Sequence, residues 1–206
     1  MLEVKGNLLE ADVDVIMHQV NCKGVMGAGV ARQIRQKLLS EEEYQRYVTK
    51  CHAFPATELL GTYMEHKTSR FRVIDLFGEN QPTGKGLDTD YDALYQALSK
   101  AVEANKNNSI AVPGYLGCGL GGGDWETVYR MLQEISEKYQ AKITIYYIPD
   151  SLRMLWDDFG NVLMDPETEC IEKEWHGFPV GTHREEIWHW FEETFQISVA
   201  KEFFHL

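Results

Sequence analysis

The sequence predicts an α/β protein in which helices cover both faces of a largely parallel sheet. Apolar runs with strand character alternate along the chain with segments whose apolar residues recur at helical spacing. Two glycine-rich stretches, 24–29 and 114–123, each follow a predicted strand and precede a predicted helix. The 206 residues are 44% hydrophobic and 25% charged, which suits one ordinary globular domain with a small appendage.

Strands and helices can be assigned in order from the N-terminus to residue 149. The run over 13–20 is continuously apolar, as in a strand buried on both faces. The other predicted strands are 61–65 and 72–77, on either side of a polar turn, then 110–113 and 143–148. The predicted helices are 28–39, about 41–54, one that carries Tyr91, Leu94, Tyr95, Leu98 and Val102, and one that carries Val128, Met131, Leu132 and Ile135.

Polar residues that can accept hydrogen bonds from free helix N–H groups mark where these helices begin. Ser40 and Glu43 fit a capping box, in which the two side chains serve opposite ends of one turn. The later helices have candidate caps at Asp88, Thr89 or Asp90 and at Asp124.

The character of the sequence changes after Pro149. Residues 150–206 hold four of the five tryptophans, and Thr182 can cap a helix over about 183–195. We therefore expect a domain over 1–149 and a small helical extension over 150–206. The aromatic side chains of the extension are expected to pack on the domain or on another subunit.

The formal net charge of −12 limits the partners of this chain. Such a surface repels polyphosphate backbones, so no direct binding to a nucleic-acid backbone is expected. A small phosphate-bearing ligand remains compatible with this charge, because backbone N–H groups can hold phosphate without basic side chains.

Several classes of site and location are disfavoured by what the sequence contains. The four cysteines have no C-x-x-C spacing, so free thiols are expected and no metal site. No apolar run approaches the ~20 residues of a membrane span, and the N-terminus has no apolar core of a secretory signal. We therefore expect a cytoplasmic protein that does not contact membranes.

The two glycine-rich stretches can form one phosphate-binding site. Ligands of parallel α/β sheets lie beyond the carboxyl ends of the strands, where both stretches begin. Glycine allows positive φ and a close approach of a ligand to successive N–H groups. The stretch GVMGAG is neither a Rossmann fingerprint nor a Walker A loop, since its glycine spacing differs and no G-K-[ST] follows. A tight turn without a ligand is the simpler reading of each stretch, but two of them favour a diphosphate.

Three segments resemble the signatures of a known family. KGNLL, VDVIMHQVNCKGVMGAGVA and VPGYLGCGLGGGDWETV are similar, in this order, to segments of macrodomains. The resemblance covers about residues 1–149 and implies a three-layer α/β/α sandwich with a mixed, mostly parallel sheet. It also implies ADP-ribose as ligand, with no cofactor. The most similar branches contain ADP-ribose-1''-phosphate phosphatases and terminal ADP-ribose glycohydrolases.

The resemblance assigns ligand contacts to individual positions. Asn21 matches an asparagine that bonds the distal ribose, and Asn7 stands where many macrodomains have an aspartate that contacts the adenine amino group. The residues assigned to the ligand are Asn7, Leu8, Asn21, Lys23, Gly27, Ala28, Gly29, Val30, Gly117, Cys118, Gly119, Leu120 and Gly121. Lys23 is placed near the phosphates, although an exposed loop lysine is the simpler reading.

Two residues are candidates for catalysis. His18 matches a histidine of the phosphatase-type branch, where imidazole can exchange protons or orient water. Asp124 is the second candidate, although a helix cap is its simplest role. The glycohydrolase branch uses a strand lysine and an aspartate after its GCGL motif; here the strand over 73–77 has no lysine and Gly121 takes the place of the aspartate.

Two functions therefore remain open. The chain is expected either to hydrolyse a group from the distal ribose of an ADP-ribose derivative, or to be a reader, which binds ADP-ribose without catalysing a reaction. For the hydrolase, the group is a 1''-phosphate or an ADP-ribosyl link to a side chain, and water is the attacking group. For the reader, the partner is free ADP-ribose or an ADP-ribosylated protein.

Overall fold

One mixed six-stranded sheet forms the centre of the computed structural model, which describes residues 1–197. Its strands are β1 (Leu2–Lys5), β2 (Val15–Asn21), β3 (Tyr63–Lys67), β4 (Arg72–Glu79), β5 (Ser109–Pro113) and β6 (Lys142–Tyr147). They lie in the order β1-β6-β5-β2-β4-β3, and only the pairing of β3 with β4 is antiparallel. The predicted mixed, mostly parallel sheet is confirmed.

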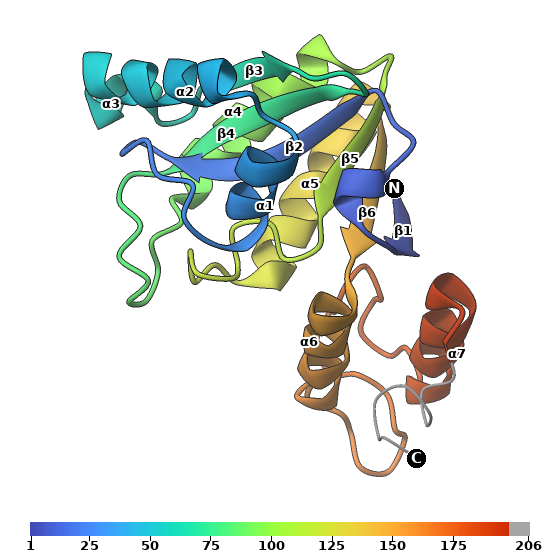
Figure 1. Ribbon diagram of the computed structural model, residues 1–206. Helices are drawn as coiled ribbons and strands as arrows, with labels where there is room; N and C mark the ends of the chain where they lie inside the picture. The colour runs from blue at the N-terminus through green and yellow to red at the C-terminus, as the bar shows by residue number, and fades with distance from the viewer. Residues whose placement is uncertain (198–206) are drawn as a thin grey trace.

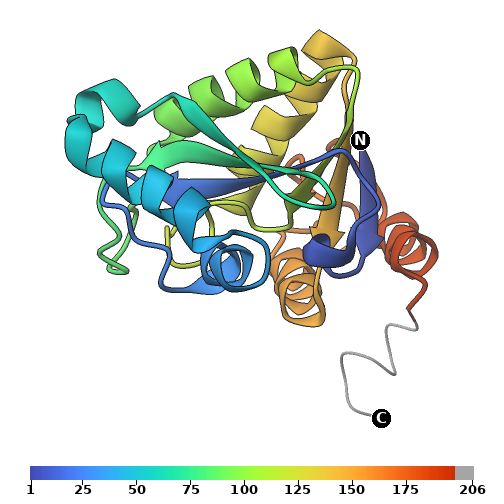
Figure 2. The same cartoon turned by 45° about the horizontal axis from the view of Figure 1, so that its top comes forward.

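Helices cover both faces of this sheet, as the predicted α/β/α sandwich requires. The helices before the extension are η1 (Leu8–Glu10), α1 (Gly29–Lys37), α2 (Glu41–Ala53), α3 (Ala56–Leu59), α4 (Tyr91–Ala104) and α5 (Trp125–Tyr139). Figure 2 shows α4 and α5 above the sheet and the blue helices α1 and α2 below it. The short elements β1, η1 and α3 were not predicted.

The alternation of side chains along β2 gives each face of the sheet its own core. Val15 and Met17 join the apolar cluster that contains the buried side chains of α4 and α5. Ile16 packs in the cluster of Ile34 on α1, and Val20 packs with the tyrosines of α2. His18 alternates with these residues and therefore faces the α1/α2 side.

The helix caps confirm part of the sequence prediction. The side chains of Ser40, Asp90 and Asp124 each accept a hydrogen bond from a backbone N–H in the first turn. The capping box is incomplete, because the Glu43 carboxylate bonds to Arg46 and His66 instead. The last helix lies where predicted, but its predicted cap is wrong, since His183 caps it and the Thr182 hydroxyl bonds to Pro179 O.

The C-terminal extension is helical and continues the core of the domain. It contains α6 (Pro149–Gly160) and α7 (Arg184–Phe195), which lie at the end of the sheet formed by β1 and β6 (Figure 1). Its buried side chains, Trp175 and Phe191 among them, belong to the same apolar cluster as α4 and α5. His176 Nε2 bonds to Glu3 Oε2 on β1 over 2.7 Å. Within residues 1–197, no helix has both the length and the apolar character of a membrane span.

Candidate functional site

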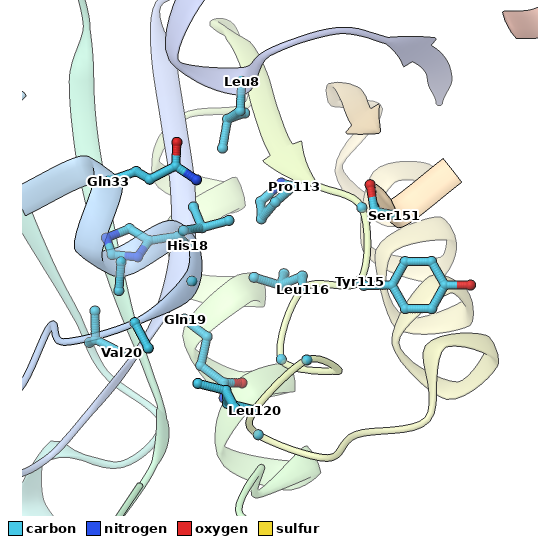
Figure 3. A pocket seen from close by; sticks show the side chains of 18 of the residues that line it. Leu8, His18, Gln19, Val20, Gln33, Pro113, Tyr115, Leu116, Leu120 and Ser151 are labelled. Carbon is cyan, nitrogen blue, oxygen red and sulfur yellow. The ribbon is translucent and has the colours of Figure 1, made fainter. Parts of the chain in front are cut away.

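A pocket of about 610 Å³ lies at the carboxyl ends of the parallel strands. Its volume is within the ~300–1,000 Å³ typical of small-molecule sites. Both glycine-rich loops line it: loop 1 (residues 21–30) follows β2, and loop 2 (residues 114–123) follows β5. Figure 3 shows His18 on one side of this pocket and Tyr115 with Ser151 on the other. The two loops therefore converge on one site, as predicted.

Loop 1 is held by the side chain of Asn21. Its Oδ1 accepts hydrogen bonds from Lys23 N at 3.0 Å and Val25 N at 3.2 Å, and its Nδ2 donates to Val25 O at 2.7 Å. Tyr47, buried on α2, donates its hydroxyl hydrogen to Asn21 O at 2.7 Å. Asn21 also lines the pocket, so the residue predicted to bond the ribose also gives the loop its shape.

Replacing Asn21 by alanine is expected to weaken ADP-ribose binding by about 10- to 100-fold, because several hydrogen bonds that shape loop 1 are lost together. Titration calorimetry measures this change. Asn80→Ala, in the exposed part of the next loop, is the control and is expected to bind normally. Binding by Asn21→Ala that matches the control would contradict this role.

Loop 2 is fastened to the segment before α4. The Thr89 hydroxyl donates to Gly117 O at 2.7 Å, and Gln19 Nε2 donates to Thr89 Oγ1 at 2.9 Å. Backbone N–H groups of Asp88 and Thr89 both donate to Gly121 O at 2.9 Å. These bonds fix the path of loop 2 through its carbonyl groups. The N–H groups of residues 119–121 donate to no group among the described residues, so they can bind a ligand.

A chain of hydrogen-bonded polar side chains runs from the pocket across β2, β4 and β3 to α2, on the face of the sheet that α1 and α2 cover. His18 Nε2 lies 2.7 Å from Asp75 Oδ1, and Asp75 Oδ2 lies 2.7 Å from His66 Nε2. His66 Nδ1 lies 2.8 Å from Glu43 Oε2, which also accepts a hydrogen bond from Arg46. Asp75 and His66 are 0% exposed and His18 is 1% exposed. We refer to His18, Asp75, His66 and Glu43 as the buried relay.

The buried relay shifts the pKa values of two of its members. Burial disfavours the charged forms of both His66 and Asp75, but their mutual hydrogen bonds and opposite charges outweigh it. The pKa of His66 is therefore raised by Asp75, with a further contribution from Glu43. The pKa of Asp75 is lowered by His18 and by His66. Both groups favour their charged forms in the folded protein.

This arrangement predicts a pH dependence of stability. The contribution of His66 is complete below its ordinary pKa of 6.5 and is lost as the pH rises through its higher folded value. The contribution of Asp75 is present above its ordinary pKa of 3.8 and is lost as the pH falls through its lower folded value. Urea unfolding measures the free energy of unfolding of wild type and of His66→Gln. The difference between them is expected to be largest between pH 3.8 and pH 6.5 and smaller at alkaline pH.

The exposed histidine on the same helix as Glu43 provides the control for that series. His52→Gln is expected to leave the pH profile of wild type unchanged. A difference between wild type and His66→Gln that grows as the pH rises above 6.5 would contradict a charged His66.

Glu79 is a pocket residue that the sequence analysis missed. It ends β4 opposite Asn21, is 9% exposed and lines the pocket. Burial raises the pKa of Glu79, and the charge of Asp88 adds to this effect. The signal in the sequence was an acidic residue two positions after the predicted strand over 72–77. Of the described lining residues, His18 and Glu79 are the two buried side chains that carry an ionisable group.

Most predicted site residues meet at the pocket. Its lining includes Asn7, Leu8, His18, Asn21, Gly27, Ala28, Gly29, Val30, Gly117, Gly119, Leu120 and Gly121. The Asn7 amide is partly used, since its Oδ1 caps η1 and its Nδ2 donates to Glu10. The lining also includes Gln19 and Gln33, which were not predicted.

Three predicted residues do not line the pocket. Asp124 caps α5 by accepting hydrogen bonds from the backbone and hydroxyl of Thr127, so its position does not support catalysis. Lys23 is exposed, and Cys118 bonds to Leu116 O. Burial raises the pKa of the Cys118 thiol, which disfavours the reactive thiolate.

The extension contributes one wall of the pocket. Asp150, Ser151 and Met154 of α6 line it together with Tyr115 of loop 2. The Tyr115 ring stacks on Trp125, and its hydroxyl donates to Asp158 of α6. The segment predicted to be a separate extension thus reaches the candidate site. The boundary after residue 149 stays a prediction.

An α/β/α sandwich with glycine loops around a pocket at the carboxyl edge of its sheet defines a class of ligand-binding domain. Residues 17–132, more than half of this chain, match the Macro domain family. The chain belongs to that family.

Named relatives carry ADP-ribosyl hydrolase activities. A DNA ADP-ribosyl glycohydrolase of Thermus aquaticus is 30% identical over 71% of this chain and 40% of its own length. The human ADP-ribose glycohydrolase OARD1 is 26% identical over 69% of this chain and 88% of its own. The solved macrodomain of Mycobacterium tuberculosis DarG is 27% identical with a TM-score of 0.58, over 69% of this chain and 96% of that one. The chain spans less than half the length of the DNA ADP-ribosyl glycohydrolases it matches.

Proposed function

We propose that this chain binds ADP-ribose and hydrolyses the bond at C1'' of its distal ribose, releasing ADP-ribose from an ADP-ribosylated macromolecule. The observation that carries this proposal is the convergence of loops 1 and 2 with His18 and Glu79 at one pocket. The names of the relatives support the same reaction.

Each part of the pocket has a role in this reaction. The free backbone N–H groups of loop 2 and of the α1 N-terminus hold the diphosphate. Loop 1 holds the distal ribose through Asn21 and Gly27–Val30. Glu79, which is paired with Asn21 between β2 and β4, is the acidic residue assigned to C1''. Water attacks C1'', with His18 and Glu79 exchanging the protons that the attacking and leaving groups lose and gain. The backbone N–H groups also stabilise developing negative charge.

A covalent intermediate on lysine is not part of this proposal. The described residues that line the pocket include neither lysine nor arginine. The same observation favours the second candidate function, in which the chain reads ADP-ribose without hydrolysing the group attached to it.

The nature of the macromolecule is also a proposal. The charge of −12 opposes diffuse binding to a phosphate backbone, but it does not prevent the capture of an ADP-ribosyl group attached to nucleic acid. The expectation of no direct binding to a nucleic-acid backbone has no support from the relatives, some of which are named for DNA. We therefore include DNA among the substrates, beside proteins.

The test offers the purified chain three substrates: an ADP-ribosylated oligonucleotide, an ADP-ribosylated peptide and ADP-ribose-1''-phosphate. Release of ADP-ribose from either of the first two is the expected result. Glu79→Gln and His18→Asn are each expected to lower kcat by about 100-fold or more. Tight ADP-ribose binding without turnover of any substrate would support the reader, and turnover of the phosphate alone would support a phosphatase.

A further inference from the structure

The buried relay contains more charge than a structural pair of side chains needs. Asp75 lies on β4, between β2 and the edge strand β3, with both carboxylate oxygens bonded to imidazole nitrogens. An ionised carboxylate without access to water is costly unless its partners compensate it. One charged histidine would provide that compensation, yet the sequence places two histidines there, and one of them lines the pocket.

Hydrogen-bond counting determines where the protons of the buried relay lie. An ionised carboxylate only accepts hydrogen bonds, so His18 and His66 must both present Nε2–H to Asp75. His66 Nδ1 faces a second carboxylate, that of Glu43, and must also carry a hydrogen. His66 is therefore an imidazolium, and its charge balances that of Asp75.

His18 is then left with one free nitrogen. Its Nε2–H is donated to Asp75, and its Nδ1 is buried with no hydrogen-bond partner among the described residues. A buried nitrogen without a partner is rare in proteins and calls for a water or a ligand group. The pocket beside His18 is where such a group can bind.

We propose that Asp75 and His66 are positioning residues that hold His18 in the Nε2–H tautomer, so that the Nδ1 lone pair accepts a hydrogen bond or a proton in the pocket. Glu43 holds the charge on His66 from the outer end, and Arg46 on the surface of α2 neutralises Glu43. This inference rests on the proposed function, because it names the group that accepts the proton of the attacking water.

The proton balance of the step is simple. As the water oxygen bonds to C1'', one of its protons passes to His18 Nδ1 and the bond from C1'' to the leaving group breaks. His18 becomes an imidazolium whose second N–H stays bonded to Asp75. The proton then passes to the departing group, so that the products are ADP-ribose and the protonated acceptor. Asp75 stays ionised throughout, as the orienting carboxylate of a catalytic triad does.

The test is ¹⁵N NMR of the full chain with labelled histidine. In the ligand-free wild type, His18 is expected to show a protonated Nε2 and an unprotonated Nδ1. Addition of ADP-ribose is expected to shift the Nδ1 resonance, because this nitrogen has no partner among the described residues and belongs to a side chain that lines the pocket. A protonated Nδ1 in neutral His18, or a resonance that ADP-ribose leaves unchanged, would overturn the inference, whether or not the protein turns over a substrate.

Variants separate positioning from a merely structural role. Asp75→Asn presents an NH₂ donor in place of one carboxylate oxygen and is expected to shift His18 towards the Nδ1–H tautomer. Its kcat is expected to fall by about 100-fold or more, with the Kd for ADP-ribose within about threefold of wild type. His66→Gln keeps a donor to Asp75 but no charge, and a loss of about 10-fold in kcat is expected.

The matched controls are His52→Gln and Glu42→Gln, which change exposed residues of the helix that carries Glu43. Both are expected to match wild type in tautomer and kcat. Glu43 is half-buried, so Glu43→Gln provides a milder variant if Asp75→Asn does not fold. If the spectra agree with the inference but wild type consumes no substrate, the proposed hydrolysis fails and the tautomer assignment stands. An Asp75→Asn protein with wild-type tautomer and kcat would overturn the positioning role.

Discussion

Replacing Gly122 by alanine is expected to lower the affinity for ADP-ribose by about 100-fold or more while the domain stays folded. Gly122 has φ +66°, and a Cβ atom built there would lie 2.0 Å from Gly86 O. Heavy atoms do not approach so closely, and the obstacle is backbone that no side-chain rotation can move. Loop 2 must therefore move away from the segment before α4 that carries Gly86.

The consequence for the pocket follows from what those loops hold. Gly121 O accepts hydrogen bonds from the N–H groups of Asp88 and Thr89, and separation of the loops breaks both. Thr83 and Gly84 line the pocket from the segment before α4, and Gly119 and Gly121 line it from loop 2. A shift of even one ångström misplaces the N–H groups that would hold the diphosphate.

Titration calorimetry with ADP-ribose measures this effect, and thermal unfolding shows whether the fold survives. Gly160→Ala is the control, because a Cβ atom at Gly160 meets nothing within 4 Å. A Gly122→Ala protein that binds ADP-ribose within about threefold of the control would show that the contact between the loops does not shape the site.

Replacing Asp75 by alanine is expected to destabilise the fold by about 3–5 kcal/mol. The substitution leaves the charge of His66 in the sheet without its carboxylate and removes a hydrogen-bond partner from His18. It also opens a cavity at a side chain that is 0% exposed. Small domains have only about 5–15 kcal/mol of stability, so this variant is expected to unfold at much lower urea concentration.

Urea unfolding of wild type and of Asp75→Ala measures this loss. Asp12→Ala removes an exposed carboxylate and is expected to stay within about 0.5 kcal/mol of wild type. A loss for Asp75→Ala as small as that of the control would mean that the carboxylate is not ionised in the folded protein.

The sequence predicted the parts of the fold that local pattern specifies. The apolar run of β2 and the glycines that follow it led to loop 1, and the same reasoning led to loop 2 after β5. The cap Asp124 was predicted, and the cap Asp90 was one of three candidates, because a carboxylate before an amphipathic segment has one dominant local use. The strand β1 has only four residues, LEVK, and its place is set by its partner β6, far away in the sequence.

The buried relay was beyond local reasoning for a physical reason. Its members lie on β2, α2, β3 and β4, and only tertiary packing brings them together. Glu43 was assigned to a capping box because its spacing from Ser40 fits one, yet a buried charge on His66 competes more strongly for its carboxylate. Asp75 gave no signal beyond one polar letter in an apolar strand. The pocket wall from α6 was missed because α6 itself was not predicted as an element.

The most direct test of the central claim is a titration of the uniformly ¹⁵N-labelled chain with ADP-ribose, followed through its backbone amides. The account predicts that amide resonances of residues 27–30 and 117–121 shift with the same dissociation constant for ADP-ribose. It also predicts that AMP and ribose 5-phosphate, which lack the diphosphate bridge, bind far more weakly. No association at millimolar ADP-ribose, or shifts confined to residues away from the two loops, would contradict it.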